Sequence, residues 1–172
     1  MMINTLQAIL YLYPTLSPGP DFTLTPQSDG PAVIRTWTTT VAPQPTVEQL
    51  TAAWDVMELG AAQTAQIEAL AVPYQAALQA PVAYMGTTFD ADSQSQIVVA
   101  HAMLVYAVEG AVPAGFYFAD ADGNKVPMTL TQLQGLGSAI AGNYLPVFQK
   151  WTELKAQVMA ATTLEEVQAV VW

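Results

Sequence analysis

The single histidine of the chain, His101, is the first residue whose side chain could carry out chemistry. It lies in the apolar run IVVAHAMLVY, and the nearest serine, Ser95, is six residues earlier and off its helical face. A serine nucleophile needs an imidazole within hydrogen-bonding reach, and a histidine-based metal site needs more than one imidazole. We therefore interpret His101 as a packed or partly exposed helical residue, with a general base as the alternative.

Two acidic groups could bind a hard cation or act as a pair of catalytic carboxyls: Asp90 with Asp92, and Asp120 with Asp122 and Asn124. The second group begins like a calcium loop, but Gly123 stands at the fourth position instead of the sixth and Thr131 replaces the bidentate Glu. We interpret Asp122 and Gly123 as the centre of a tight hairpin turn in which both residues have positive φ. Asp90 and Asp92 flank an expected helix start, where negative charge is favourable.

Other residue patterns that could support catalysis are missing from the sequence. Cysteine is absent, which excludes thiolate nucleophiles and thiolate metal ligands. Gly135, Gly137 and Gly142 lie in an expected helix without a following Lys-Ser/Thr pair, so we interpret them as positions of close packing and not as a phosphate loop. We predict no catalytic residue, no cofactor and no metal ligand, and hence a protein that is not an enzyme.

Composition restricts the partners. The 172 residues include 14 Asp or Glu and four Lys or Arg, for a formal net charge of −10, and 52% are hydrophobic while 10% are charged. Four scattered cations cannot neutralise a phosphate backbone, and the long uncharged stretches are interrupted before they reach the roughly 20 apolar residues of a spanning helix. We expect no nucleic acid and no membrane partner, but a surface that is covered by another chain or by self-association.

The elements that must position these residues alternate helices with short strands. Helices are expected at 3–13, from Thr46 to Pro81, at 93–108, from 129 onward and at 163–172. Thr46 and Ser93 have capping-box spacing, and Asp92 is the alternative cap of the helix at 93–108. Hairpins are expected within 21–40 and 115–128, one strand at 82–89, a kink or break at Pro73 and a kink at Pro146. The fold class is α+β, mainly helical with short antiparallel hairpins, in two small units. The expected domains are an N-terminal module at 1–45, an Ala/Gln-rich connecting helix at 46–81 and a C-terminal α+β domain at 82–172.

The first hairpin supplies the candidate interface. Alternation places Val33, Arg35 and Trp37 on one face of its second strand, and a two-stranded ribbon is marginal in water unless something packs against it. We predict Val33, Ile34 and Trp37 as partner-binding residues. The alternative for Trp37 is that it belongs to the core of this module.

Both halves of the chain resemble proteins encoded near bacteriophage tail fibre genes. INTLQAILYLYP at 3–14, AVIRTW at 32–37 and PTVEQL at 45–50 are similar to the N-terminal module of phage tail assembly and tail fibre chaperone-type proteins. TFDAD at 88–92, FADADGNKVPMT at 118–129 and the C-terminal residues 154–172 resemble an uncharacterised domain recurrent in phage tail-region proteins. The matching residues are turns, caps and core positions.

This resemblance implies a tail fibre chaperone or a fibre-associated structural subunit that binds a trimeric tail fibre protein. It implies a location in the fibre or baseplate region of the virion tail, or in the host cytoplasm during assembly, and it transfers no catalytic residue. The alternative function is a glycan-binding or glycan-hydrolysing tail component that acts on host surface polysaccharide through the aspartate pairs or the aromatic residues.

Overall fold

The computed structural model describes residues 3–172, and its fold is α+β, as predicted. The chain is 55% helical, and the described residues form three two-stranded antiparallel sheets. Two compact units are present: unit 1 holds the described residues up to Ala65 with Thr162–Leu164, and unit 2 holds Gln66–Ala161 with Glu165–Trp172. The division between Ala65 and Gln66 falls inside one helix, α2 (Val47–Leu78).

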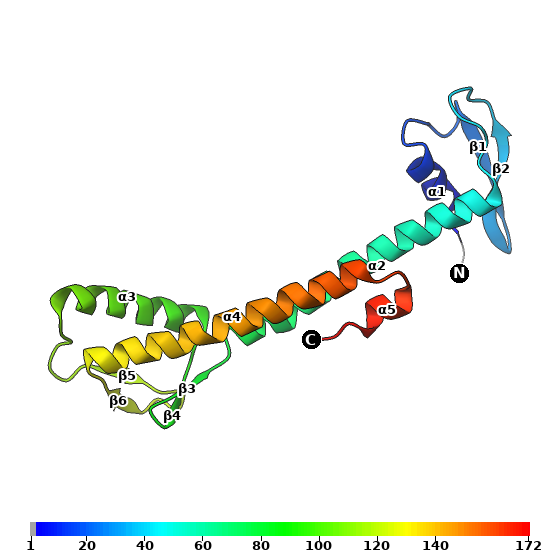
Figure 1. Ribbon diagram of the computed structural model, residues 1–172. Coiled ribbons are helices and arrows are strands. Elements are labelled where there is room, and N and C mark those ends of the chain that lie inside the picture. Colours follow the sequence, from blue (N-terminus) through cyan, green and yellow to red (C-terminus); the bar gives the residue numbers. More distant parts are fainter. Residues whose placement is uncertain (1–2) are drawn as a thin grey trace. The chain divides into compact units, whose positions relative to one another are not determined.

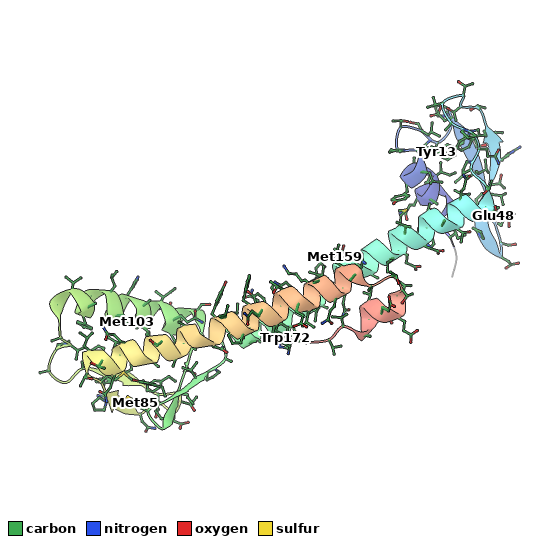
Figure 2. The ribbon with its side chains drawn as sticks, in the orientation of Figure 1. Tyr13, Glu48, Met85, Met103, Met159 and Trp172 are labelled. Atoms are coloured by element: carbon green, nitrogen blue, oxygen red, sulfur yellow. The ribbon has the colours of Figure 1, made fainter. Side chains whose placement is uncertain are left out.

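Unit 1 packs a short helix and a hairpin against the start of α2. The elements are α1 (Thr5–Leu12), β1 (Phe22–Gln27) and β2 (Gly30–Trp37). Their buried core consists of Ala8, Ile9, Leu16, Phe22, Leu50 and Ala53. The Trp37 ring stacks on Phe22 at 5.7 Å between centroids and meets the edge of Tyr13, which is labelled in Figure 2, at 5.9 Å.

The hairpin carries a β-bulge that changes which β2 residues face the core. Thr23 pairs with Thr36 while Leu24 pairs with Ile34, so Arg35 is an extra residue on β2. Because a bulge shifts side-chain alternation by one position, Ile34 and Trp37 pack against the core while Val33 and Arg35 are exposed. The predicted common face of Val33, Arg35 and Trp37 is therefore wrong.

Unit 2 is built around a helix pair. Figure 1 shows α3 (Ser93–Glu109) lying along the first part of α4 (Leu130–Ala160). The other elements are the end of α2, the hairpins β3 (Val82–Tyr84) with β4 (Thr87–Phe89) and β5 (Tyr117–Ala119) with β6 (Lys125–Pro127), and all but the first residue of α5 (Leu164–Ala169). The main buried core consists of Val82, Phe89, Ala91, Val99, Met128, Leu133 and Leu136.

Residues 82–89 form a hairpin and not the single strand that was predicted. Met85 and Gly86 both have positive φ, 52° and 80°, which is the backbone of a two-residue reversing turn. Gly86 adopts this conformation without strain, whereas a non-glycine residue in it is uncommon. The Met-Gly pair lacks the Asn or Asp that usually marks such a turn, and this concealed the hairpin.

Neither internal proline ends its helix, so of the predicted kink or break at Pro73 the break does not occur. The helix α2 continues through Pro73 to Leu78, and α4 continues through Pro146 to Ala160. Two contacts from α4 stabilise the segment of α2 after Pro73. Asn143 Nδ2 donates to the Ala77 carbonyl oxygen at 2.8 Å, and the Tyr74 ring stacks on the Trp151 ring with centroids 4.8 Å apart. These tertiary contacts compensate for the backbone hydrogen bond that proline removes.

Candidate functional site

A groove in unit 1 contains the residues predicted to bind a partner. It has a volume of about 240 Å³ and lies between the beginning of α1, the outer edge of β2 and the start of α2. Its lining includes Ile3, Pro31, Val33, Ile34, Pro45 and Val47. None of its lining residues is charged, so the groove suits an apolar segment.

Hydrogen bonds at the helix starts fix the walls of this groove. The side chain of Asn4 caps α1 by accepting from the Gln7 N–H at 3.1 Å. The predicted capping box at the start of α2 is confirmed, because Gln49 Oε1 accepts from the Thr46 N–H at 2.9 Å and Thr46 Oγ1 accepts from the Gln49 N–H at 3.2 Å. Both helix starts therefore have satisfied N-terminal caps beside the groove.

The outer edge of β2 has backbone groups that β1 does not use. Thr5 Oγ1 donates to the Ala32 carbonyl oxygen at 2.5 Å, which shows that this carbonyl points away from β1 and toward α1. In the described part of the chain the sheet has two strands, so β2 has no partner strand on this side. Pro31 has no N–H, and further pairing on this edge is limited to the residues that follow it.

The three predicted partner-binding residues have different environments. Val33 is 43% exposed and lines the groove. Ile34 also lines the groove but packs partly against the unit 1 core. Trp37 does not line it: its ring packs in the core and its Nε1 donates to the Ala42 carbonyl oxygen at 2.9 Å. The groove therefore brings Val33 and Ile34 together and leaves Trp37 as a support for β2.

Of the four aspartates considered for catalysis, two accept internal hydrogen bonds and the other two have exposed side chains. Asp120 is buried: its Oδ1 accepts from the Asp122 and Asn124 N–H groups at 3.1 and 2.8 Å, and its Oδ2 accepts from Thr87 Oγ1 at 2.9 Å. Asp92 caps α3 by accepting from the Ser95 N–H at 2.7 Å. The side chains of Asp90 and Asp122 are exposed.

Two details of these loops differ from the sequence-based expectation. Gly123 has a φ of 82°, but Asp122 does not have a positive φ, so the 120–124 segment is a loop organised by Asp120 and not a two-residue turn. Of the two predicted caps of α3, Asp92 is confirmed, and the capping box of Ser93 with Gln96 does not form. Gln96 Nε2 donates instead to the carbonyl oxygens of Leu78 and Ala91, at 3.0 and 2.7 Å.

The pKa shifts follow from the same hydrogen bonds. The Asn124 N–H is the main cause of the lowered pKa of the Asp120 carboxyl, and burial opposes it. The Ser95 N–H lowers the pKa of Asp92 at the start of α3. The pKa of Glu48, in the first turn of α2, is lowered mainly by its own backbone N–H. All three shifts stabilise the charged carboxylate at structural positions.

His101 lies exposed on α3, in agreement with the helical position expected for it. Within residues 3–172 no group of three or more His, Asp or Glu side chains is arranged to hold a metal ion. None of the helices in this range has the length and apolar character needed to cross a membrane.

A second groove, in unit 2, was not predicted from the sequence. It has a volume of about 490 Å³ between the end of α2, α3 and α4, and its lining includes Val99, Ala100, Met103, Gly137 and Tyr144. A Cβ on Gly137 would meet the Met103 sulfur, and one on Gly135 would meet the Tyr84 hydroxyl. Close packing is therefore confirmed at these two glycines, whereas a Cβ on Gly142 would meet open space.

Comparison with known families matched nearly the whole chain. Residues 5–60 match the XkdW protein family, which is phage-associated, and residues 61–171 match the domain of unknown function DUF4376. No curated protein and no solved structure matched the chain. The chain is a phage-related protein. Since the second match covers more than half of its residues, it belongs to the DUF4376 family.

Proposed function

We propose that this protein is a non-enzymatic phage tail fibre chaperone or fibre-associated structural subunit, and that unit 1 holds a segment of the fibre protein. The observation that supports this most directly is the uncharged groove beside the unpaired edge of β2, in the part of the chain that matches a phage-associated family. Its place of action is the virion tail, or the host cytoplasm while the tail is assembled.

The chemistry of the groove suggests what it would hold. A fibre chain that has not yet trimerised exposes apolar surface and unpaired strand edges, which aggregate unless they are covered. An extended segment could pair with the β2 edge beyond Pro31 and place apolar side chains against Val33 and Val47. The acidic character of the chain, with its net charge of −10, favours a neutral or basic segment.

A non-enzymatic role is supported by the structural use of the candidate acids. Asp120 directs both carboxylate oxygens to donors within its own loop and the β3–β4 hairpin, and Asp92 is committed to the α3 cap. A carboxylate that is held charged by internal donors is a poor general acid.

Co-expression with the tail fibre protein of the same phage tests the proposal. We expect a larger soluble and trimeric fraction of the fibre protein, and a complex of the two on size-exclusion chromatography. Equal fibre solubility and trimer content with and without this protein, together with no complex, would reject the proposal. Mass spectrometry of purified virions then separates a chaperone that leaves from a subunit that remains.

A further inference from the structure

The outward surface of α3 is largely apolar. The helix carries no Asp, Glu, Lys or Arg between Ser93 and Val108. Its inner side packs into the unit 2 core through Val99, Met103 and Tyr106. Its outer side presents further large side chains to solvent, including Leu104 at 68% and Val108 at 86% exposure. A helix that is hydrophobic all round is typical of a buried position.

The spacing of the outer residues is that of a helix-pairing seam. Ile97, His101, Leu104 and Val108 follow one another at intervals of four, three and four residues, which is the a/d pattern of a coiled coil. Val98 and Val105 flank this seam and are also exposed. His101 is the one polar residue of the four, and a single polar residue in such a seam fixes register at a cost in stability.

The apolar surface continues from α3 onto α4 through the unit 2 groove. Ala100 and Met103 of α3 line this groove together with Tyr144 of α4. Tyr144 stacks on Phe148 with ring centroids 5.8 Å apart, and both rings and Leu145 are exposed. We refer to the outer side of α3 with Tyr144, Leu145 and Phe148 as the α3–α4 face.

We infer that the α3–α4 face is the contact between two copies of this chain. Apart from Glu109 at the C-terminal end of α3, the face lacks charged side chains, so it offers little to recognise a charged segment. Elsewhere the chain is strongly acidic, with a net charge of −10, so repulsion between identical copies is weakest where they meet through an uncharged surface. A heptad seam is self-complementary, as a two-fold interface requires.

The exposed area of the α3–α4 face is just sufficient for a specific interface between two copies of the chain. A Val, Leu or Ile side chain presents about 100 Å² and an aromatic side chain about 150–250 Å². With their observed exposures, the side chains of the face present on the order of 500 Å² per copy. Two copies would bury about 1,000 Å², the lower limit of a specific interface, so the α3 seam alone would fall short.

The test is the mass of the purified full-length chain by analytical ultracentrifugation, from low micromolar to submillimolar concentration. We expect reversible association that Leu104→Glu and Val108→Glu each weaken at least about tenfold. Val72→Glu is the matched control, because Val72 is 72% exposed on α2 and lies outside the face. His101→Leu should strengthen the association, and so should added salt, which screens repulsion between acidic copies.

A chain that stays monomeric over this range would overturn the inference, as would equal weakening by Leu104→Glu and Val72→Glu. Circular dichroism shows whether each variant keeps the wild-type helix content, which we expect because the substituted side chains are exposed. The measurement uses this protein alone, so its outcome is independent of whether a fibre protein binds unit 1.

Discussion

Thr87 Oγ1 lies 2.9 Å from Oδ2 of Asp120, and this hydrogen bond joins the β3–β4 hairpin to the loop between β5 and β6. The Ala121 N–H donates to the Thr88 carbonyl oxygen at 2.8 Å across the same junction. Two hairpins that would be marginal alone are thus held together by one buried carboxylate and its donors.

Acid should weaken unit 2 through Asp120. Its pKa is lowered in the folded chain, mainly by the Asn124 N–H, so the carboxylate contributes stability above its unfolded pKa. That contribution is lost as the pH falls below about 4 and through the lowered folded pKa. Thermal melts from pH 7 to pH 2 should show a fall of the melting temperature at low pH, which we call the acid limb. Asp120→Asn should lower the melting temperature at pH 7 and make the acid limb less steep. Asp122→Asn is the control, since its exposed side chain should leave the limb intact, and an unchanged limb in Asp120→Asn would contradict this assignment.

Substitution of two glycines in α4 by alanine should change the free energy of unfolding in opposite directions. Gly142→Ala places a Cβ in open space within a helix and should stabilise the protein by about 0.5–1 kcal/mol. Gly135→Ala brings a Cβ onto the Tyr84 hydroxyl, so the ring must move and the substitution should destabilise by about 1–3 kcal/mol. Urea unfolding measures both, and a stabilising Gly135→Ala would contradict the close approach of β3 to α4.

The start of α4 should depend on its capping box. Thr129 Oγ1 accepts from the Gln132 N–H at 3.3 Å, and Gln132 Oε1 accepts from the Thr129 N–H at 2.8 Å. Thr129→Ala should cost about 1 kcal/mol in the free energy of unfolding. Ser138→Ala, at an exposed position inside the same helix, should change it by less than about 0.5 kcal/mol. Equal effects of the two substitutions in urea unfolding would argue against a capping role.

Binding of a fibre segment should depend on the groove of unit 1. Val33→Glu places a charge in an uncharged lining and should weaken the complex at least about tenfold, or about 1.4 kcal/mol. Val41→Glu is matched to it, because Val41 is 77% exposed in the same unit and does not line the groove. Isothermal titration with the purified fibre protein measures both affinities. Equal affinities of Val33→Glu and Val41→Glu for the fibre protein would mean that the fibre protein binds elsewhere on the chain. That result would not affect the inference that two copies meet through the α3–α4 face.

Local signals in the sequence predicted much of the fold. The capping box at Thr46 depends on residues three apart, and close packing at Gly135 and Gly137 follows from their lack of a side chain, so both could be inferred without coordinates. The same inference was wrong for Gly142, which faces open space. The continuity of α2 through Pro73 could not, because it depends on contacts from Asn143 and Trp151, which are distant in sequence.

The candidate site could be predicted only in part, because it too depends on residues that are distant in sequence. A one-residue bulge at Arg35 decides that Ile34 and not Arg35 faces the core, and no residue type in that strand marks it. Val33 and Ile34 were identified as neighbours of a possible partner, but the groove that contains them also needs Ile3 and Val47, from two other elements.

The scarcity of cations gives the folded chain a limited set of trypsin sites. Arg35 lies in β2 of the unit 1 hairpin and Lys125 lies in β6, so cleavage after them measures the opening of these strands. Lys150 and Lys155 lie inside α4, with their ammonium groups over the rings of Trp172 and Trp151 respectively. Cleavage inside a helix requires local opening of that helix. The order in which the peptide bonds after these four residues are cut under native conditions would therefore rank the opening free energies of β2, β6 and the C-terminal half of α4, without any added label.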